Sequence, residues 1–412
     1  MRALCLGVLC LGVLCLGVAG GVVWGAAAKK KRAPVQRVTA AQRAAARAEI
    51  AKRMAAAGPA FENPEALEPF YEAIAGQPIH ILQFGDSHTA SDDWVNSMRT
   101  LVQAKFGDGG PGFVQAGRPF KGYRRFDAKA AASPGWHTEG TMALRGDPDQ
   151  GISGISISTE SAGQTIGVSA SGEALSIFFL AQPGGGRVEL TADSQPMGVF
   201  TTDAVTAGPG VSSYTLLPGS HELSIRTLDH AAVRLYGWTL DNRTGATFET
   251  LGINGAQAHV MLGWNEAIWS AEVAARAPAL VILAYGTNEA NSRLWTLEDY
   301  RADMTGLIGR IRRAAPDAAI LMIGPPDCGK LRPLLHLSDV VAAQSDLARE
   351  QKVAFFDLRR HMGGTGSVKL WVTAGYGQTD YIHMTGDGYR LVGETIVKAL
   401  VETQNEQARE NH

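Results

Sequence analysis

The segment from residue 120 to residue 245 interrupts the pattern of the chain and constrains the fold most. On both sides of it, apolar runs such as "IHILQFG" and "ALVILAYG" alternate with segments of helical period. Inside it, short alternating runs such as "GRVELTA" and "HELSIRTL" are separated by turns such as Pro218-Gly219-Ser220. Short strands with frequent turns and no helical period indicate a β-sandwich. The sequence therefore predicts an all-β domain inserted into an α/β domain.

The α/β part consists of apolar strands that alternate with helices. Strands are expected at 79–84, 279–286, 318–324 and 353–358, and helices at 91–106, 259–276, 296–313, 337–350 and 386–402. Uninterrupted apolar strands are typical of a parallel sheet that is buried on both faces. The predicted fold class is α/β: a three-layer α/β/α parallel-sheet domain, interrupted by a jelly-roll-like β-sandwich.

The first residues have the composition of a targeting segment. Arg2 precedes a long apolar run that ends in three alanines, which predicts a secretory signal peptide over residues 1–28. The run is also long enough for an uncleaved membrane anchor. Three of the four cysteines lie in this segment, so Cys328 remains alone and no internal disulfide is expected.

Charge is distributed unevenly along the chain. Residues 29–53 hold nine Lys and Arg but only one acidic residue, although the whole chain has a net charge of −2. The rest of the chain is therefore acidic, which argues against a nucleic-acid partner. The basic segment is expected to be a solvated helix or linker, and contact with anionic lipid or wall polymer is the functional alternative.

These patterns divide the chain into five predicted parts. They are a signal peptide (1–28), a basic linker (29–60), the first part of the α/β domain (61–120), the inserted β-sandwich (121–245) and the second part of the α/β domain (246–412).

Two phosphate-binding patterns fail on their details. "GPPDCGK" (324–330) has Leu331 where a P-loop needs Ser or Thr, and its prolines remove backbone donors. "GDGGPG" (107–112) follows a helix and not a strand, so it indicates a turn. No His pair has the spacing of a helical zinc site, and we expect neither a metal nor a cofactor.

Serine chemistry has better support. Ser87 follows the first strand at a turn, and Asp380 and His383 are three residues apart before the last helix. A carboxylate at this spacing can orient one imidazole nitrogen while the other acts as a base. Taken singly, Ser87 could instead cap the helix 91–106, and Asp380 and His383 could be a surface pair.

Donors for an oxyanion follow two other strands. Asn288 lies just beyond the strand 279–286, and Gly255 lies in "GINGA", which follows a short strand expected after residue 246. The edge at the carboxyl ends of the strands is where open α/β sheets bind ligands. Turn chemistry is the alternative explanation for both residues.

The blocks "FGDSH", "GINGA", "YGTNEA" and "DYIH", in this order, resemble those of the SGNH/GDSL hydrolases. The resemblance implies that Ser87 is the nucleophile, His383 the base and Asp380 its orienting partner. It also implies an oxyanion hole made by the N–H groups of Ser87 and Gly255 and by the side chain of Asn288.

Two residues that depart from the usual hydrolase blocks make the chain resemble one branch of the SGNH/GDSL hydrolases more than the others. His88 stands where Leu is usual and has a substrate-contacting or structural role, and Glu289 stands where Asp is usual. Together with the inserted β-domain, they resemble the peptidoglycan O-acetylesterases that carry a carbohydrate-binding-module-like insert. This branch implies an exported esterase of the periplasm or cell envelope. Its substrate would be an O-acetylated glycan, namely peptidoglycan, from which it removes acetyl groups through an acetyl-enzyme on Ser87.

Two other functions remain open at the level of sequence. One is an esterase or lipase of the same fold that acts on other acyl esters or on another acetylated polysaccharide. The other is a non-catalytic protein that binds wall glycan. Three aromatic residues of the insert, Trp136, Tyr214 and Trp238, are candidates for stacking on sugars, although such residues more often belong to the core.

Overall fold

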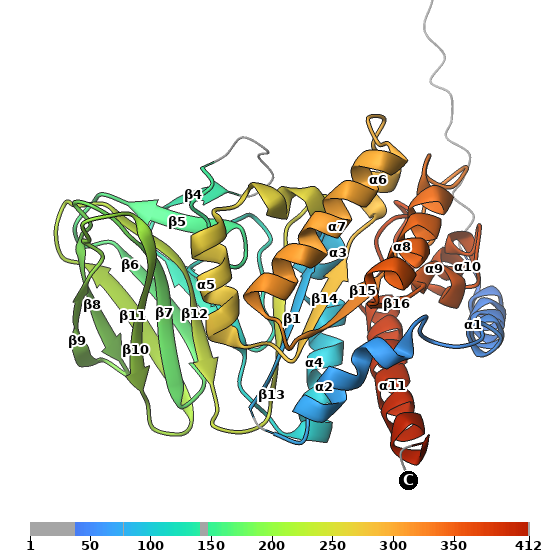
Figure 1. Ribbon diagram of the computed structural model, residues 1–412, viewed down its shortest axis with the longest axis horizontal. Coiled ribbons are helices and arrows are strands. Elements are labelled where there is room, and N and C mark those ends of the chain that lie inside the picture. The colour runs from blue at the N-terminus through green and yellow to red at the C-terminus, as the bar shows by residue number, and fades with distance from the viewer. Residues whose placement is uncertain (1–37, 77, 141–146, 411–412) are drawn as a thin grey trace, which may run out of the picture. The chain divides into compact units, whose positions relative to one another are not determined.

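A five-stranded parallel sheet forms the centre of the α/β part, as the computed structural model shows (Figure 1). The structure describes residues 38–76, 78–140 and 147–410, and residues 39–412 form one compact unit. The predicted signal peptide lies outside the described residues. In sheet order, the strands are β13 (Ala246–Gly252), β1 (Ile79–Gly85), β14 (Leu280–Ala284), β15 (Ala319–Ile323) and β16 (Ala354–Phe356).

Helices cover both faces of this sheet because alternate side chains of each strand point to opposite faces. In β1, Leu82 belongs to the hydrophobic core on one face and Ile81 to the core on the other. The first core includes side chains of α5 (Glu266–Arg276), α7 (Leu297–Ala314) and α8 (Leu337–Gln351). The second includes side chains of α2 (Glu68–Ala73), α4 (Asp93–Phe106) and α11 (Gly386–Glu410). The predicted three-layer arrangement is confirmed.

The insert consists of two antiparallel sheets that enclose a third core. In sheet order, one comprises β10 (Gly208–Thr215), β7 (Ala174–Ala181), β12 (Val233–Asp241), β5 (Ile155–Thr159) and β4 (His137–Gly140), with β2 (Gly112–Gln115) also paired to β12. The other comprises β3 (Lys129–Ala132), β6 (Thr165–Ser171), β11 (Ser220–Thr227), β8 (Arg187–Ala192) and β9 (Gln195–Thr201). The predicted inserted all-β architecture is confirmed.

The antiparallel sheets begin earlier than the predicted start of the insert at residue 121. Strand β2 pairs with β12 and carries the buried side chains of Phe113 and Val114. Of the three candidate aromatic residues, Trp238 is buried in the sandwich core, and Trp136 and Tyr214 are partly buried and pack against that core.

The predicted helix 259–276 is two elements. A 3₁₀ helix, η2 (Ala258–Gly263), ends before Trp264, and α5 then begins with Asn265 as its N-cap. The Asn265 side chain accepts hydrogen bonds from the N–H groups of Ala267 and Ile268. In a continuous helix these N–H groups would bond to carbonyls of the preceding turn. Here the Asn265 side chain bonds them instead, because a new helix begins at this residue.

Part of the basic segment is a docked helix and not a linker. Helix α1 (Ala40–Ala55) begins with a capping box between Thr39 and Gln42. Its residues Ala46 and Ile50 are buried in the second hydrophobic core. Arg47 donates a hydrogen bond of 3.0 Å to the carbonyl of Ala374, the last residue of α10 (Val368–Ala374). Among the described residues, no helix is long and apolar enough to cross a membrane.

A buried carboxyl group joins α5 to the loop before β5. Glu272 accepts a hydrogen bond from the Ile152 N–H at 2.8 Å, and its other oxygen has no partner among the described residues. Burial raises the pKa of Glu272 from 4.5 to about 8, although the Ile152 hydrogen bond lowers it. The folded state therefore favours the neutral form more than the unfolded state does.

The stability that this shift contributes is complete below pH 4.5 and is lost as the pH rises through about 8. Glu272→Gln is neutral at every pH, so its Tm relative to the unmodified protein should rise between pH 5 and pH 9. Thermal unfolding across this range tests the prediction, with the exposed Glu160→Gln as a matched control. Parallel Tm profiles for Glu272→Gln and the unmodified protein would contradict it.

Candidate active site

Ser87 is placed by a tight turn at the carboxyl end of β1. Helix α3 (Ser87–Ala90) begins at this residue, and the side chain of Asp86 caps the helix by accepting from the His88 N–H at 2.9 Å. The N-cap of the following helix α4 is Asp92. The interpretation of Ser87 as a helix cap is therefore wrong, and its hydroxyl is available for other contacts.

Two glycines allow α3 to lie directly against the edge of the sheet. A Cβ at Gly252 would overlap the Ala90 nitrogen of α3. One at Gly85 would overlap the Thr89 side chain of α3 and stand 2.8 Å from the Ala284 carbonyl oxygen. No side chain fits at such distances, so this approach requires glycine at both positions. Gly85 pairs with Gly252 on one side and with Ala284 on the other, so the three strands end at the same level.

The structure brings Ser87 together with the two residues of the C-terminal block. Ser87 Oγ lies 2.9 Å from His383 Nε2, and His383 Nδ1 lies 2.8 Å from Asp380 Oδ2. The other oxygen of Asp380 accepts hydrogen bonds from the N–H groups of Ile382 and His383. This row of hydrogen bonds from a hydroxyl through an imidazole to a carboxylate can perform nucleophilic and general-base chemistry.

The charge of Asp380 sets the orientation of the imidazole. Partial burial raises the pKa of Asp380, but hydrogen bonds from His383 and from the Ile382 N–H bring the pKa below its usual value. An ionised carboxylate can only accept hydrogen bonds, so Nδ1 of His383 donates to it. The other nitrogen, Nε2, is then free to accept the proton of Ser87.

Asp380→Asn should lower kcat on an activated acetate ester by about 10²–10⁴-fold, because the amide does not enforce this tautomer or stabilise the imidazolium. Steady-state kinetics on para-nitrophenyl acetate measure the effect. The exposed Asp387→Asn, in the first turn of α11, is the control. A loss below threefold for Asp380→Asn would show that this carboxylate does not orient the base.

His88 contacts both Tyr389 and the candidate base His383. Its side chain is buried, and its Nδ1 lies 3.0 Å from the hydroxyl of Tyr389. Its ring packs against that of His383, with ring centroids 5.2 Å apart. Burial lowers the pKa of His88, so the ring is neutral beside the candidate base. Nothing in the local sequence indicates the contact with Tyr389.

The two remaining predicted site residues lie on one connected loop system. Gly255 is exposed and has a φ of 76°, and the Asn288 side chain donates to the carbonyl of the next residue, Ala256, at 2.9 Å. Asn288 belongs to the short helix α6 (Thr287–Asn291), which follows β14. Ser87 is the first residue of its helix, so its N–H has no intrahelical acceptor. An oxyanion hole from these three residues stays a prediction.

Glu289 links the loop that contains Gly255 to the loop that contains Asn288. One carboxyl oxygen accepts from the Ala258 N–H at 2.8 Å, and the other accepts from the Gly286 N–H at 3.0 Å. The side chain is buried. Glu289 lies in the block "YGTNEA", but no local sequence pattern indicates its hydrogen bond with Ala258, because that contact depends on the order of the strands in the sheet.

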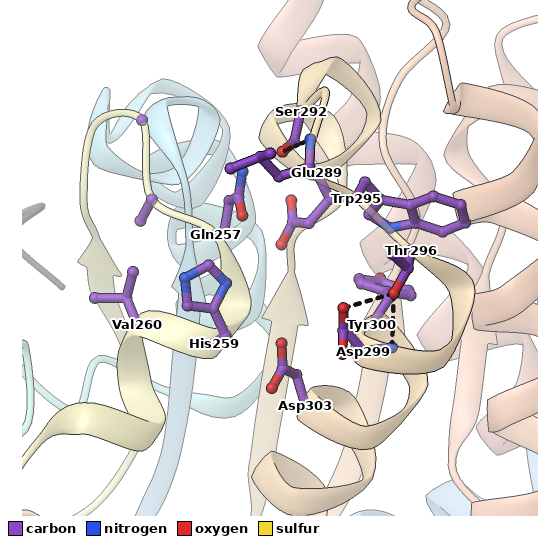
Figure 2. A pocket seen from close by; sticks show the side chains of 13 residues that line it. Gln257, His259, Val260, Glu289, Ser292, Trp295, Thr296, Asp299, Tyr300 and Asp303 are labelled. Carbon is purple, nitrogen blue, oxygen red and sulfur yellow. Dashed lines mark hydrogen bonds between the residues drawn. The ribbon is translucent and has the colours of Figure 1, made fainter.

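A cavity of about 450 Å³ opens beside these loops (Figure 2). One wall is the segment from Gly255 to Val260, and the other runs from Glu289 to Asp303. Most of its lining belongs to none of the predicted blocks. Within the described residues, no group of three or more His, Cys, Asp or Glu side chains is arranged to hold a metal ion.

Comparisons with known proteins find a family model and a solved structure to which this chain is similar. The model of the GDSL-like lipase/acylhydrolase family matches residues 203–391, a range that includes Gly255, Asn288, Asp380 and His383. The chain is also similar to the solved structure of a peptidoglycan O-acetylesterase, at 26% identity and a TM-score of 0.69. That likeness covers 84% of this chain and 96% of the other. The chain is therefore similar to the GDSL-like lipase/acylhydrolase family over residues 203–391. It is a carboxylic ester hydrolase.

The family match begins at residue 203, inside the insert, so it does not include Ser87. A family two carbohydrate esterase from Clostridium thermocellum is similar at 14% identity and a TM-score of 0.32, covering 66% of this chain and 99% of its own. One from Cellvibrio japonicus is similar at 12% identity and a TM-score of 0.31, covering 68% and 98%. These weaker likenesses say nothing about the substrate of this chain. No curated protein sequence matches it.

Proposed function

We propose that this protein is an exported serine O-acetylesterase that removes acetyl groups from the cell-wall glycan peptidoglycan. The hydrogen-bond chain from Ser87 through His383 to Asp380 supports serine chemistry. The observation that carries the choice of substrate is the likeness to a peptidoglycan O-acetylesterase over 84% of the chain. Export, to the periplasm or cell envelope, rests on the apolar pattern of residues 1–28.

The proposed reaction has two steps. Ser87 Oγ attacks the acetyl carbonyl while its proton passes to His383 Nε2, and the ester C–O bond then breaks as His383 returns the proton to the sugar oxygen. Water, deprotonated by His383, next attacks the acetyl-enzyme and releases acetate and Ser87. The N–H groups of Ser87 and Gly255 and the Asn288 amide would stabilise the negative oxygen in both steps.

The basic segment 29–60 is proposed to contact wall polymer or anionic lipid through those of its charges that α1 does not use. Arg47 already packs over the ring of Tyr376, 4.8 Å from its centroid. The charges of this helix are therefore partly committed to the fold.

Acetate release from O-acetylated peptidoglycan tests the proposal, with chemically de-O-acetylated peptidoglycan as the blank. A parallel assay compares para-nitrophenyl acetate with para-nitrophenyl octanoate. We expect acetate release from the glycan and a higher kcat/KM on the acetate ester. A preference for the octanoate would favour an esterase for other acyl esters. Glycan binding without hydrolysis of either ester would favour a non-catalytic wall-binding protein.

A further inference from the structure

The cavity beside the candidate oxyanion loops has a lining suited to a particular class of ligand. Its opening carries Leu294 and Trp295, which lie between α6 and α7, and the exposed fraction of Leu294 is 90%. Carboxylates of Asp299 and Asp303 lie along the first turns of α7, and His259 faces them from η2 (Figure 2). Its volume of about 450 Å³ lies within the usual range of small-molecule sites, roughly 300–1,000 Å³.

The carboxylate of Asp303 is available to a ligand. It makes no hydrogen bond or ion pair with any described residue, and no Lys or Arg of the described chain lines the cavity. Partial burial raises the pKa of Asp303, while the nearby His259 lowers it. Asp299 accepts a hydrogen bond from the Thr296 hydroxyl, which leaves its other oxygen for a further donor. The cavity therefore offers acceptors that lack donors.

The apolar side of the cavity is held rigidly. The ring of Trp295 stacks on that of His336, with centroids 4.8 Å apart and planes at 26°, and it also contacts the ring of Tyr300. A ring fixed in this way loses little conformational entropy when a ligand packs against it. The cavity thus combines an apolar edge with carboxylate acceptors.

This combination distinguishes a sugar from an acyl chain. A pyranose has an apolar C–H face and hydroxyl donors on its rim, and hydroxyls donate strong charge-assisted hydrogen bonds to carboxylates. An acyl chain would instead remove Asp303 from water without giving it a partner, which is unfavourable. The cavity also shares Gly255 and Glu289 with the candidate oxyanion loops, so it adjoins the place where the ester would react.

We propose that this cavity is a subsite for a pyranose ring of the glycan that lies next to the acetylated sugar. Asp299 and Asp303 accept hydrogen bonds from its hydroxyls, and the apolar edge formed by Leu294 and Trp295 contacts its C–H face. The subsite rests on the proposed glycan O-acetylesterase function and assigns it a contact beyond the acetyl group.

The test compares two substrates of one active site. Kinetics are measured on soluble O-acetylated glycan strands and on para-nitrophenyl acetate, which has no sugar. In Asp303→Asn and Trp295→Leu, the ratio of kcat/KM on the strands to kcat/KM on the nitrophenyl ester should fall about tenfold or more, through KM for the strands. Asp317→Asn, at an exposed carboxylate beyond the far end of α7, should keep the ratio of the unmodified protein.

Each outcome separates the subsite from the proposed function. An unchanged ratio in both variants, with acetate still released from the strands, overturns the subsite and leaves the proposed function standing. An equal loss on both substrates assigns these residues to the support of the oxyanion loops and also overturns the subsite. No acetate release from the strands by the unmodified protein, with the nitrophenyl ester still cleaved, overturns the proposed function and the subsite with it. Tm values of both variants near that of the unmodified protein show that folding is retained.

Discussion

Replacing Ser87 with alanine is expected to lower kcat/KM on para-nitrophenyl acetate by about 10³–10⁶-fold. The substitution removes the oxygen that lies 2.9 Å from His383 Nε2, and no other side chain of the triad can form the acetyl-enzyme. The fold should persist, because Asp86 and not Ser87 caps α3. Steady-state kinetics and thermal unfolding measure the two effects.

Ser91→Ala is the matched control for this variant. Ser91 follows α3 immediately, and its hydroxyl donates to the His88 carbonyl at 2.9 Å without contacting His383. It should keep most of the activity. If Ser87→Ala retained a tenth or more of the activity with an unchanged Tm, Ser87 would not be the nucleophile.

Glu289→Ala should lower kcat by about 10²-fold, the loss typical for one oxyanion donor. The carboxyl group holds the N–H groups of Ala258 and Gly286, so its removal loosens the loop that carries Gly255 and Asn288. The free energy of unfolding should also fall by about 2–4 kcal/mol, because two buried backbone donors lose their acceptors. Glu289 is a positioning residue, and its loss should change kcat more than KM.

Glu289→Gln provides the discriminating comparison. The amide oxygen preserves one of the two contacts, so this variant should recover part of the kcat and stability that alanine loses. Burial raises the pKa of Glu289 from 4.5 to about 7, although hydrogen bonds from the N–H groups of Ala258 and Gly286 lower it. Its stabilising contribution is complete below pH 4.5 and is lost as the pH rises through about 7, a dependence that Glu289→Gln lacks. Equal kcat for the alanine and glutamine variants would contradict the positioning role.

The strands of the parallel sheet could be predicted because each is buried on both faces. The apolar run 279–286 contains β14, and 353–358 contains β16. Docking of α1 was not predictable in the same way. Its alanines and arginines form no strong apolar stripe, and its position depends on contacts of Arg47 and Ile50 with elements more than 300 residues later.

The candidate site shows the same division. The blocks containing Ser87, Gly255, Asn288, Asp380 and His383 could be predicted because their order along the chain resembles that of the SGNH/GDSL hydrolases. Whether Ser87 was a cap or faced a histidine was not decided locally, because Asp86 and Ser87 are both good capping residues. Likewise, the carboxylates of the cavity look like ordinary first-turn residues of α7 until the opposite wall is in place.

The sequence by itself determined the class of fold, the presence of the β-insert and the order of the hydrolase blocks. These follow from burial periodicity and turn chemistry, which act over a few neighbouring residues. Only the tertiary structure decided that Ser87 contacts His383 across 296 positions, that Glu289 joins two loops and that a carboxylate-lined cavity adjoins them. Such contacts depend on strand order and on the packing of distant side chains, which no local pattern encodes.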